Sequence, residues 1–291
     1  MSDESSKVLP FSIPPIIGYQ MHAFPLTVVL DNEECLPWFY SNYIQLFCKE
    51  QFTGTFFDFF NLNTGEWLNF CYPGSPHVIY NAVDPVVLYT GGVNVTEFLM
   101  NYIDRGYYIC IFLDEFHIPG KRPYQKSRFN HDSLIFGYDS KEGYFHTAGF
   151  DNTGAYTRSI LSFEDFEKAH LSSDIETCLI VLFKKNTDIK YEFDLKLVTE
   201  MLEDYVKSRN SSERLRMLRN PEKDIVYGIG IYKQLIKYIE VLAETDIEFD
   251  HIKPFHILWE HKKCMLLRLK YIEEKCKITS IAEYYSSYEK I

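Results

Sequence analysis

The sequence lacks three features that mark large classes of protein. No run of about 18 apolar residues occurs, so no membrane-spanning helix is expected. No dense Lys/Arg cluster occurs and the net charge is −11, which argues against nucleic-acid binding. The seven cysteines include no CxxC pair, and several lie in apolar runs, which is typical of reduced thiols. With a polar, acidic N-terminus in place of a signal peptide, this predicts a cytoplasmic protein.

Motifs for cofactors and metals are also missing. Tyr227–Gly230 lacks the further glycine or the Lys-Ser/Thr of a phosphate-binding loop. His256, Glu260 and His261 share one predicted helix, but their order matches no zinc-protease pattern. We therefore expect a buried polar cluster there, and neither a cofactor nor a metal.

Aromatic residues are abundant, at 16% of the 291 residues, with 22 Tyr and 23 Phe. They predict an aromatic core, or an aromatic groove for a hydrophobic ligand or partner. Strand-like and helical segments alternate up to about residue 185, and helical periodicity dominates afterwards. The prediction is an α+β domain with an antiparallel sheet at 1–185, and a helical C-terminal domain at 186–291 packed on it.

Local patterns predict several elements. Apolar spacing at 36–49 and 225–243 indicates helices, and the apolar residues at 27–30 indicate a short strand or the lead-in to another element. Asn94 or Thr96 is expected to cap a helix over 94–105, which has an apolar stripe. Ser162 is expected to open a short helix, because Ser162 with Asp165 three residues later resembles a capping box.

The segment 129–151, FNHDSLIFGYDSKEGYFHTAGFD, holds the main candidate site. Residues 134–138 and 144–148 predict two strands joined by a turn at 139–143. Antiparallel neighbours would bring His131, before the first strand, close to Asp151, after the second. A histidine held by a carboxylate is fixed in one tautomer and can act as a base.

The candidate nucleophile for this base is Cys35. It precedes Leu36 and Pro37 at a predicted helix start, where the helix dipole lowers a thiol pKa. Glu33 and Glu34 beside it have the opposite effect. Cys71 is a weaker candidate. The segment 114–117, Asp-Glu-Phe-His, is either a solvated loop, a carboxylate pair lining a cleft, or a set of metal ligands.

The residues HDSLIFGYD at 131–139, with Tyr107-Tyr108, Asp114-Glu115 and FEDF at 163–166, carry a resemblance. They are similar to papain-like proteins related to butirosin biosynthesis protein H, from nonribosomal peptide and polyketide gene clusters, and to bacteriocin-leader peptidases. The resemblance covers about residues 10–185, and the helix around 257–263 is similar to the C-terminal part of some cluster proteins.

The resemblance implies a papain-like core and a cytoplasmic acyltransferase or thioester-cleaving enzyme. Its cysteine, at Cys35, would take an acyl group from an acyl or peptidyl carrier protein and pass it to a small amine, with His131 moving the proton and Asp151 orienting it. A homodimer of the chain is also possible. In the family, however, the cysteine opens the first long helix, whereas Cys35 here follows Asn32-Glu33-Glu34.

Three alternatives remain open. The chain could be a non-catalytic papain-like protein that binds a synthetase or carrier protein, or a cysteine peptidase with the same acyl-enzyme chemistry. Metal-dependent hydrolysis is the third. A Cys35 thiol near the His131 ring would favour the enzyme, and a Cys35 side chain directed into the core would favour the binding protein.

Overall fold

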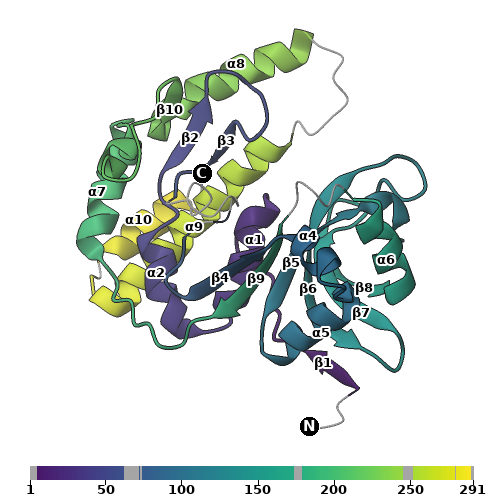
Figure 1. Cartoon of the computed structure of the whole chain (residues 1–291). Helices are drawn as coiled ribbons and strands as arrows, with labels where there is room; N and C mark the ends of the chain where they lie inside the picture. The colour runs from purple at the N-terminus through teal and green to yellow at the C-terminus, as the bar shows by residue number, and fades with distance from the viewer. Residues whose placement is uncertain are drawn as a thin grey trace. The chain divides into compact units, whose positions relative to one another are not determined.

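The computed structural model describes residues 5–61, 72, 74–173, 179–244, 252–278 and 280–289. The chain is α+β, with antiparallel sheets and C-terminal helices (Figure 1). It divides into two compact units: residues 1–33 with 63–190, and residues 34–62 with 191–291. This division differs from the expected 1–185 and 186–291, because the segment 34–62 belongs with the C-terminal helices.

The first unit contains, among the described residues, a seven-stranded antiparallel sheet in the order β4-β9-β5-β6-β7-β8, with β1 also paired to β6. Its strands are β1 (Ser6–Val8), β4 (Val78–Val83), β5 (Tyr108–Asp114), β6 (Asn130–Asp139), β7 (Tyr144–Phe150), β8 (Tyr156–Ser162) and β9 (Ile180–Lys185). Its helices are α1 (Gln20–Val29), α4 (Pro85–Thr90), α5 (Val95–Asp104), η2 (Glu115–His117) and α6 (Phe163–Leu171).

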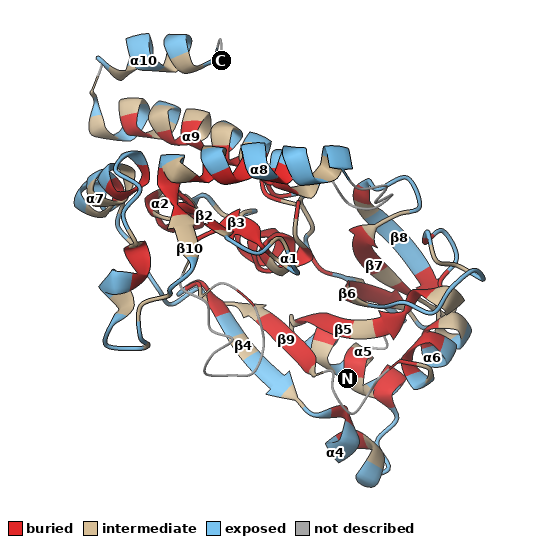
Figure 2. Cartoon of the chain, turned by 90° about the horizontal axis from the view of Figure 1, so that it is seen from above, coloured by how far each residue is buried: buried red, intermediate tan, exposed pale blue. Residues whose placement is uncertain are grey.

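The central strands of this sheet are covered on both faces. Helix α1 lies on one face, and α5 and α6 on the other (Figure 2). Side chains pointing both ways are therefore buried in β5, β6 and β9, while the edge strands β4 and β8 carry exposed residues. The predicted hairpin at 134–148 is confirmed: residues 134–138 are all buried, whereas Tyr144 and His146 of the return strand are partly exposed.

Two helix caps in this unit agree with the prediction, with Asn94 rather than Thr96 capping α5. The Asn94 side chain accepts a hydrogen bond from Glu97 N at 3.0 Å at the start of α5. Ser162 Oγ accepts from Asp165 N at 3.1 Å at the start of α6. The strand predicted at 27–30 is wrong, because these residues end α1. Nine of the ten residues of α1 are buried, so the helix is buried on all sides and its sequence shows no amphipathic pattern.

The second unit, in its described part, has a three-stranded antiparallel sheet in the order β10-β2-β3 with helices packed around it. Its strands are β2 (Leu46–Lys49), β3 (Phe57–Phe59) and β10 (Ile225–Tyr227). Its helices are α2 (Leu36–Ser41), α7 (Leu195–Val206), η3 (Ser211–Leu215), η4 (Gly228–Gly230), α8 (Ile231–Glu244), α9 (Lys253–Cys276) and α10 (Ile281–Tyr288), with η1 (Glu33–Cys35) at the boundary between the units.

The helix predicted over 36–49 is wrong beyond Ser41. Asn42 is extended, Tyr43 has a positive φ of 52°, and the chain continues as β2. The guanidinium of Arg268 donates to the carbonyl oxygens of Tyr40, Asn42 and Tyr43. A buried side chain 225 or more residues away thus satisfies the carbonyls where α2 stops, and no local pattern could reveal it.

The helix predicted over 225–243 is also wrong at its start. Ile225–Tyr227 form β10, which pairs with β2, and α8 begins only at Ile231. Gly228 separates the two with a φ of 58°, and a Cβ at this position would lie 2.0 Å from Tyr205 O. Only glycine can therefore occupy this turn.

Candidate functional site

His131 is the second residue of β6, paired across the sheet with Leu113 of β5. Its side chain is one-third exposed. Within the described part of the chain, its polar contacts are with Gln20, Glu115 and Asp132. These side chains come from the start of α1, from η2 directly after β5, and from β6 itself.

Gln20, the first residue of α1, is buried and joins the helix to the hairpin. Its Nε2 donates to the backbone oxygen of Asp132 at 2.6 Å and to Asp132 Oδ1 at 2.8 Å. Its Oε1 accepts from Phe150 N at 3.2 Å, and Nε2 lies 3.4 Å from His131 Nδ1. The group that α1 presents to the histidine is therefore an amide.

Glu115 and Lys121 form the other wall of the site. Glu115 Oε1 lies 3.4 Å from His131 Nδ1 and 3.6 Å from Lys121 Nζ. Lys121 Nζ also donates to Phe150 O at 2.6 Å. Burial lowers the pKa of the Lys121 ammonium, and the Glu115 carboxylate offsets part of that effect.

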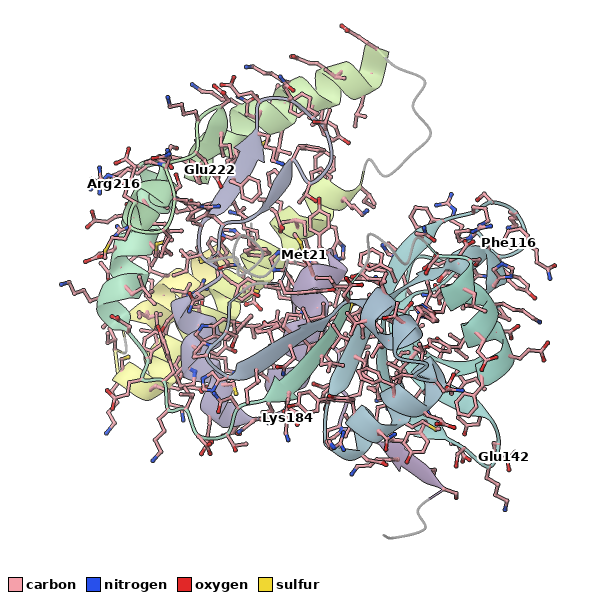
Figure 3. All side chains as sticks on the ribbon, in the orientation of Figure 1. Met21, Phe116, Glu142, Lys184, Arg216 and Glu222 are labelled. Carbon is pink, nitrogen blue, oxygen red and sulfur yellow. The ribbon has the colours of Figure 1, made fainter. Side chains whose placement is uncertain are left out.

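A glycine makes room for this arrangement. A Cβ on Gly149 would lie 2.8 Å from Gln20 Oε1 and 3.0 Å from Lys121 Nζ, so a side chain there would displace both groups. We refer to Gln20, Glu115, Lys121, His131 and Asp132 as the His131 cluster. Figure 3 labels Met21 and Phe116, the sequence neighbours of Gln20 and Glu115, and Glu142, in the turn at the far end of the hairpin.

Asp114 fixes the loop that carries Glu115 and Lys121. Its Oδ1 accepts from Phe116 N at 3.1 Å and from Phe129 N at 3.0 Å, and its Oδ2 pairs with Arg128. Burial alone would raise the pKa of this carboxyl, but the two backbone donors and Arg128 outweigh burial and lower it. The expectation of a solvated loop at 114–117 is wrong for its two carboxylates, since Asp114 and Glu115 are both buried.

The Asp151 side chain bonds to residues of its own turn. Its Oδ1 accepts from Thr153 N at 2.8 Å, from Thr153 Oγ1 at 2.7 Å and from Ala155 N at 3.0 Å. These bonds, led by the Thr153 hydroxyl, lower the pKa of its carboxyl. The hairpin register would, if continued, bring Asp151 opposite His131, as expected. The carboxylate nevertheless stabilises its own turn, and the carboxylates in contact with the ring are Glu115 and Asp132.

Cys35 ends η1 and is the N-cap of α2, which agrees with a cysteine at a helix start. It is only 1% exposed, whereas Glu33 and Glu34 beside it are exposed. Cys35 belongs to the second unit, and His131 and Asp151 belong to the first. Cys71, the weaker candidate, lies outside the described residues.

Of the group His256, Glu260 and His261, the side chains of Glu260 and His261 are buried, as expected, whereas the His256 side chain is 36% exposed. His256 Nε2 and Glu260 Oε1 are 3.1 Å apart along α9. The Nε2–H of His261 donates to Ile44 O at 2.8 Å, and burial lowers its pKa to about 3, so the ring is neutral. Among the described residues, no group of three or more His, Cys, Asp or Glu side chains could hold a metal ion.

The sequence did not reveal Gln20 or Lys121 as site residues. Gln20 is 111 positions from His131, and it lies in no recognisable catalytic motif. Glu115 was within a candidate segment, but nothing there indicated that it would face His131. The one local signal was Gly149, beside the predicted return strand, because a glycine in a strand can mark a close approach of other groups.

The comparisons with known proteins found no match, either to a protein-family model or to a curated protein. In the described ranges, every helix is too short or too polar to cross a membrane.

Proposed function

We propose that this chain is a non-catalytic binding protein with a papain-like first unit. In the family that the sequence resembles, the nucleophile opens the first long helix. Here the first long helix is α1, its first residue is Gln20, and the Gln20 amide lies 3.4 Å from the His131 ring. An amide cannot form an acyl-enzyme, because it has no nucleophilic thiolate or alkoxide. This is the observation that carries the proposal.

Two further observations support it. The Cys35 side chain is buried, as we expect of a binding protein rather than an enzyme. The Asp151 carboxylate accepts three hydrogen bonds within its own turn, so it is already engaged. The partner that we propose is an acyl or peptidyl carrier protein, or the synthetase that holds it, in the cytoplasm.

Acyl transfer through Cys35, His131 and Asp151 is the competing proposal, favoured by the position of Cys35 as a helix N-cap. Intact-mass spectrometry of the chain after incubation with an acyl-loaded carrier protein separates the two. The wild type and Cys35→Ala should both stay free of an acyl adduct, and both should form a complex with the carrier in native mass spectrometry. Cys110→Ala, which removes a buried cysteine of β5, is the matched control.

The binding proposal fails if an acyl group appears on Cys35, or if turnover is lost in both Cys35→Ala and His131→Ala while the fold is intact. Release of peptide fragments from a leader-peptide substrate, dependent on Cys35, would instead identify a cysteine peptidase. Absence of any complex with the carrier would contradict the proposed partner.

A further inference from the structure

Helix α8 of the second unit has one packed side and one exposed side. Its packed side holds the buried residues Ile231, Gln234, Leu235 and Tyr238, together with the partly exposed Leu242. The other side carries exposed residues along the length of the helix (Figure 2). These residues form two neighbouring rows, one apolar and one charged.

The apolar row of α8 consists of Ile236, Ile239 and Ala243. All three are exposed, Ile236 by 57% and Ile239 by 49%. At 100° per residue they lie within about 60° of one another around the helix axis. Tyr232 begins the same row, but it is partly buried, and Lys262 Nζ lies 5.6 Å from the centre of its ring. The apolar row is therefore open to a partner from Ile236 onwards.

The charged row consists of Lys233, Lys237, Glu240 and Glu244, which are all the charged residues of α8. All four are exposed, and they lie within about 60° of one another, beside the apolar row. On the other side of the charged row is Val241, which is 40% exposed. Along the helix, the row therefore reads as two lysines followed by two glutamates.

This order of charges is unfavourable within a single helix. Lys233 and Lys237 are four residues apart, and so are Glu240 and Glu244, so each pair brings like charges together. Lysines near the start of a helix and glutamates near its end also oppose the helix dipole. In the described part of the chain, no ion pair joins any of the four to another side chain. The charged row therefore does not stabilise the chain on its own.

A second copy of α8 that runs antiparallel supplies the opposite charges. With a two-fold axis at the level of Tyr238, Lys237 lies within about 1.5 Å, along the helix, of Glu240 in the second copy. Lys233 lies within the same distance of Glu244 in that copy, and the two-fold axis repeats both pairs. A parallel copy would instead place lysines opposite lysines.

The same axis brings the two apolar rows together. Ile236 of each copy lies within about 1.5 Å, along the helix, of Ile239 in the other copy. Helix α8 is about 21 Å long, so one helix pair buries less than the roughly 800 Å² per partner of a typical stable interface. We therefore expect a reversible dimer with a Kd of about 100 μM.

The charged row also bears on other kinds of partner. An anionic membrane or a nucleic acid attracts its lysine half and repels its glutamate half. A second copy is the partner whose reversed order of charges the sequence itself supplies. We propose that the apolar row and the charged row of α8 form a dimer interface, at which two copies of this chain pair through antiparallel α8 helices. This inference does not depend on the proposed function.

Sedimentation velocity of the full chain at about 10–500 μM tests the proposal. We expect a monomer–dimer equilibrium whose Kd rises at least about fivefold between about 50 mM and 500 mM salt. Ile236→Ser/Ile239→Ser should raise the Kd at least about tenfold. Leu195→Ser/Lys196→Glu, a matched exposed apolar and basic pair in α7, should dimerise like the wild type.

Two charge variants test the order of the row. Lys233→Glu/Lys237→Glu makes the row fully acidic, and Glu240→Lys/Glu244→Lys makes it fully basic. Each variant alone should dimerise at least about tenfold more weakly than the wild type, and a mixture of the two should dimerise at least as well. The basic variant lowers the net negative charge of the chain, so stronger self-association of this variant would show that overall charge governs association and would overturn the proposal. Circular dichroism of each variant checks the fold, and the mixing result tests the interface directly.

Cross-linking tests the antiparallel direction. A carbodiimide joins a lysine to a glutamate that it contacts, and an equal mixture of isotope-labelled and unlabelled chains identifies links between copies. We expect a link between Lys233 of one copy and Glu244 of the other, which are about 16 Å apart within one helix. A monomer at about 500 μM, a dimer with intermolecular links only outside α8, or two charge variants that fail to associate when mixed would each overturn the proposal. So would binding to phosphatidylserine vesicles or duplex DNA that the α8 substitutions abolish, in a chain that stays monomeric.

Discussion

Replacing Gln20 by alanine should strongly lower the free energy that is needed to open the β6–β7 hairpin of the first unit. The side chain is 5% exposed and makes three hydrogen bonds to the hairpin: two to Asp132 and one from Phe150 N. Asp132 is partly exposed, so water can replace its lost donors, and each of those bonds should cost about 1 kcal/mol. The Phe150 N–H, in a partly buried position, loses its acceptor at a cost of about 1–2 kcal/mol.

The sum is about 3–4 kcal/mol for opening the β6–β7 hairpin. Hydrogen exchange detected by mass spectrometry measures this free energy on peptides from 130–150, apart from the second unit. Peptides from α8 and α9 are the internal reference, because the Gln20 side chain bonds to the hairpin of the first unit and these helices belong to the second unit. The expected result is faster exchange in the hairpin peptides alone.

The isosteric change Gln20→Glu sharpens the test. It replaces the donor amide by a carboxylate that faces Asp132 O and Oδ1, so the new group should have a raised pKa in the folded state. With a carboxyl pKa raised by folding, the penalty is complete above the folded-state pKa, declines as the pH falls through that pKa, and is absent below the unfolded pKa of about 4.3. Hairpin exchange that stays within about 0.5 kcal/mol of wild type in Gln20→Ala, or a Gln20→Glu penalty independent of pH, would refute the reasoning.

The ring-nitrogen NMR resonances of His131 should move in Glu115→Gln and stay unchanged in Asp151→Ala. The reverse result would show that His131 pairs with Asp151, as the sequence predicted. Asp114→Asn should lower the urea midpoint at pH 7, and the gap to wild type should narrow below about pH 4, because protonation then removes the contribution of the wild-type carboxylate. A difference in urea midpoint between wild type and Asp114→Asn that is as large at pH 3 as at pH 7 would contradict this. Arg268→Met should destabilise the second unit by about 3 kcal/mol in urea unfolding followed by tryptophan fluorescence, since three carbonyl oxygens lose their donor; an unchanged midpoint would show that water satisfies them.

The part of the fold that the sequence predicted well depends on short-range patterns. The hairpin at 134–148 is marked by two apolar runs and a Gly-containing turn, and α5 and α6 by capping residues a few positions before their apolar stripes. Each signal lies within about ten residues of the structure that it specifies. Such signals are read correctly because the local geometry and the tertiary packing agree.

The errors occur where distant residues decide the backbone. The aromatic residues after Ser41 have helical spacing, yet Tyr43 adopts a positive φ and Leu46–Lys49 pair with β3 and β10. The lost helical hydrogen bonds are replaced by strand pairing and by Arg268. Tertiary contacts of this kind override the helix propensity of a segment. The residues that make them lie outside positions 36–49, so the local sequence could not predict them.

The candidate site illustrates the same limit at the level of chemistry. The hairpin spacing in the sequence correctly predicted that His131 and Asp151 lie at the same end of the hairpin, but it cannot predict which donors the Asp151 carboxylate accepts from. Asp151 finds three donors within four residues of itself, and these local bonds cost less conformational entropy than a contact across the sheet. The histidine is then contacted by Gln20 and Glu115, one from a helix start and one from a loop held by Asp114. Because both are positioned by buried bonds to the hairpin or its neighbours, the cluster is built as part of the fold. That is the reason to expect its substitutions to change stability more than any turnover.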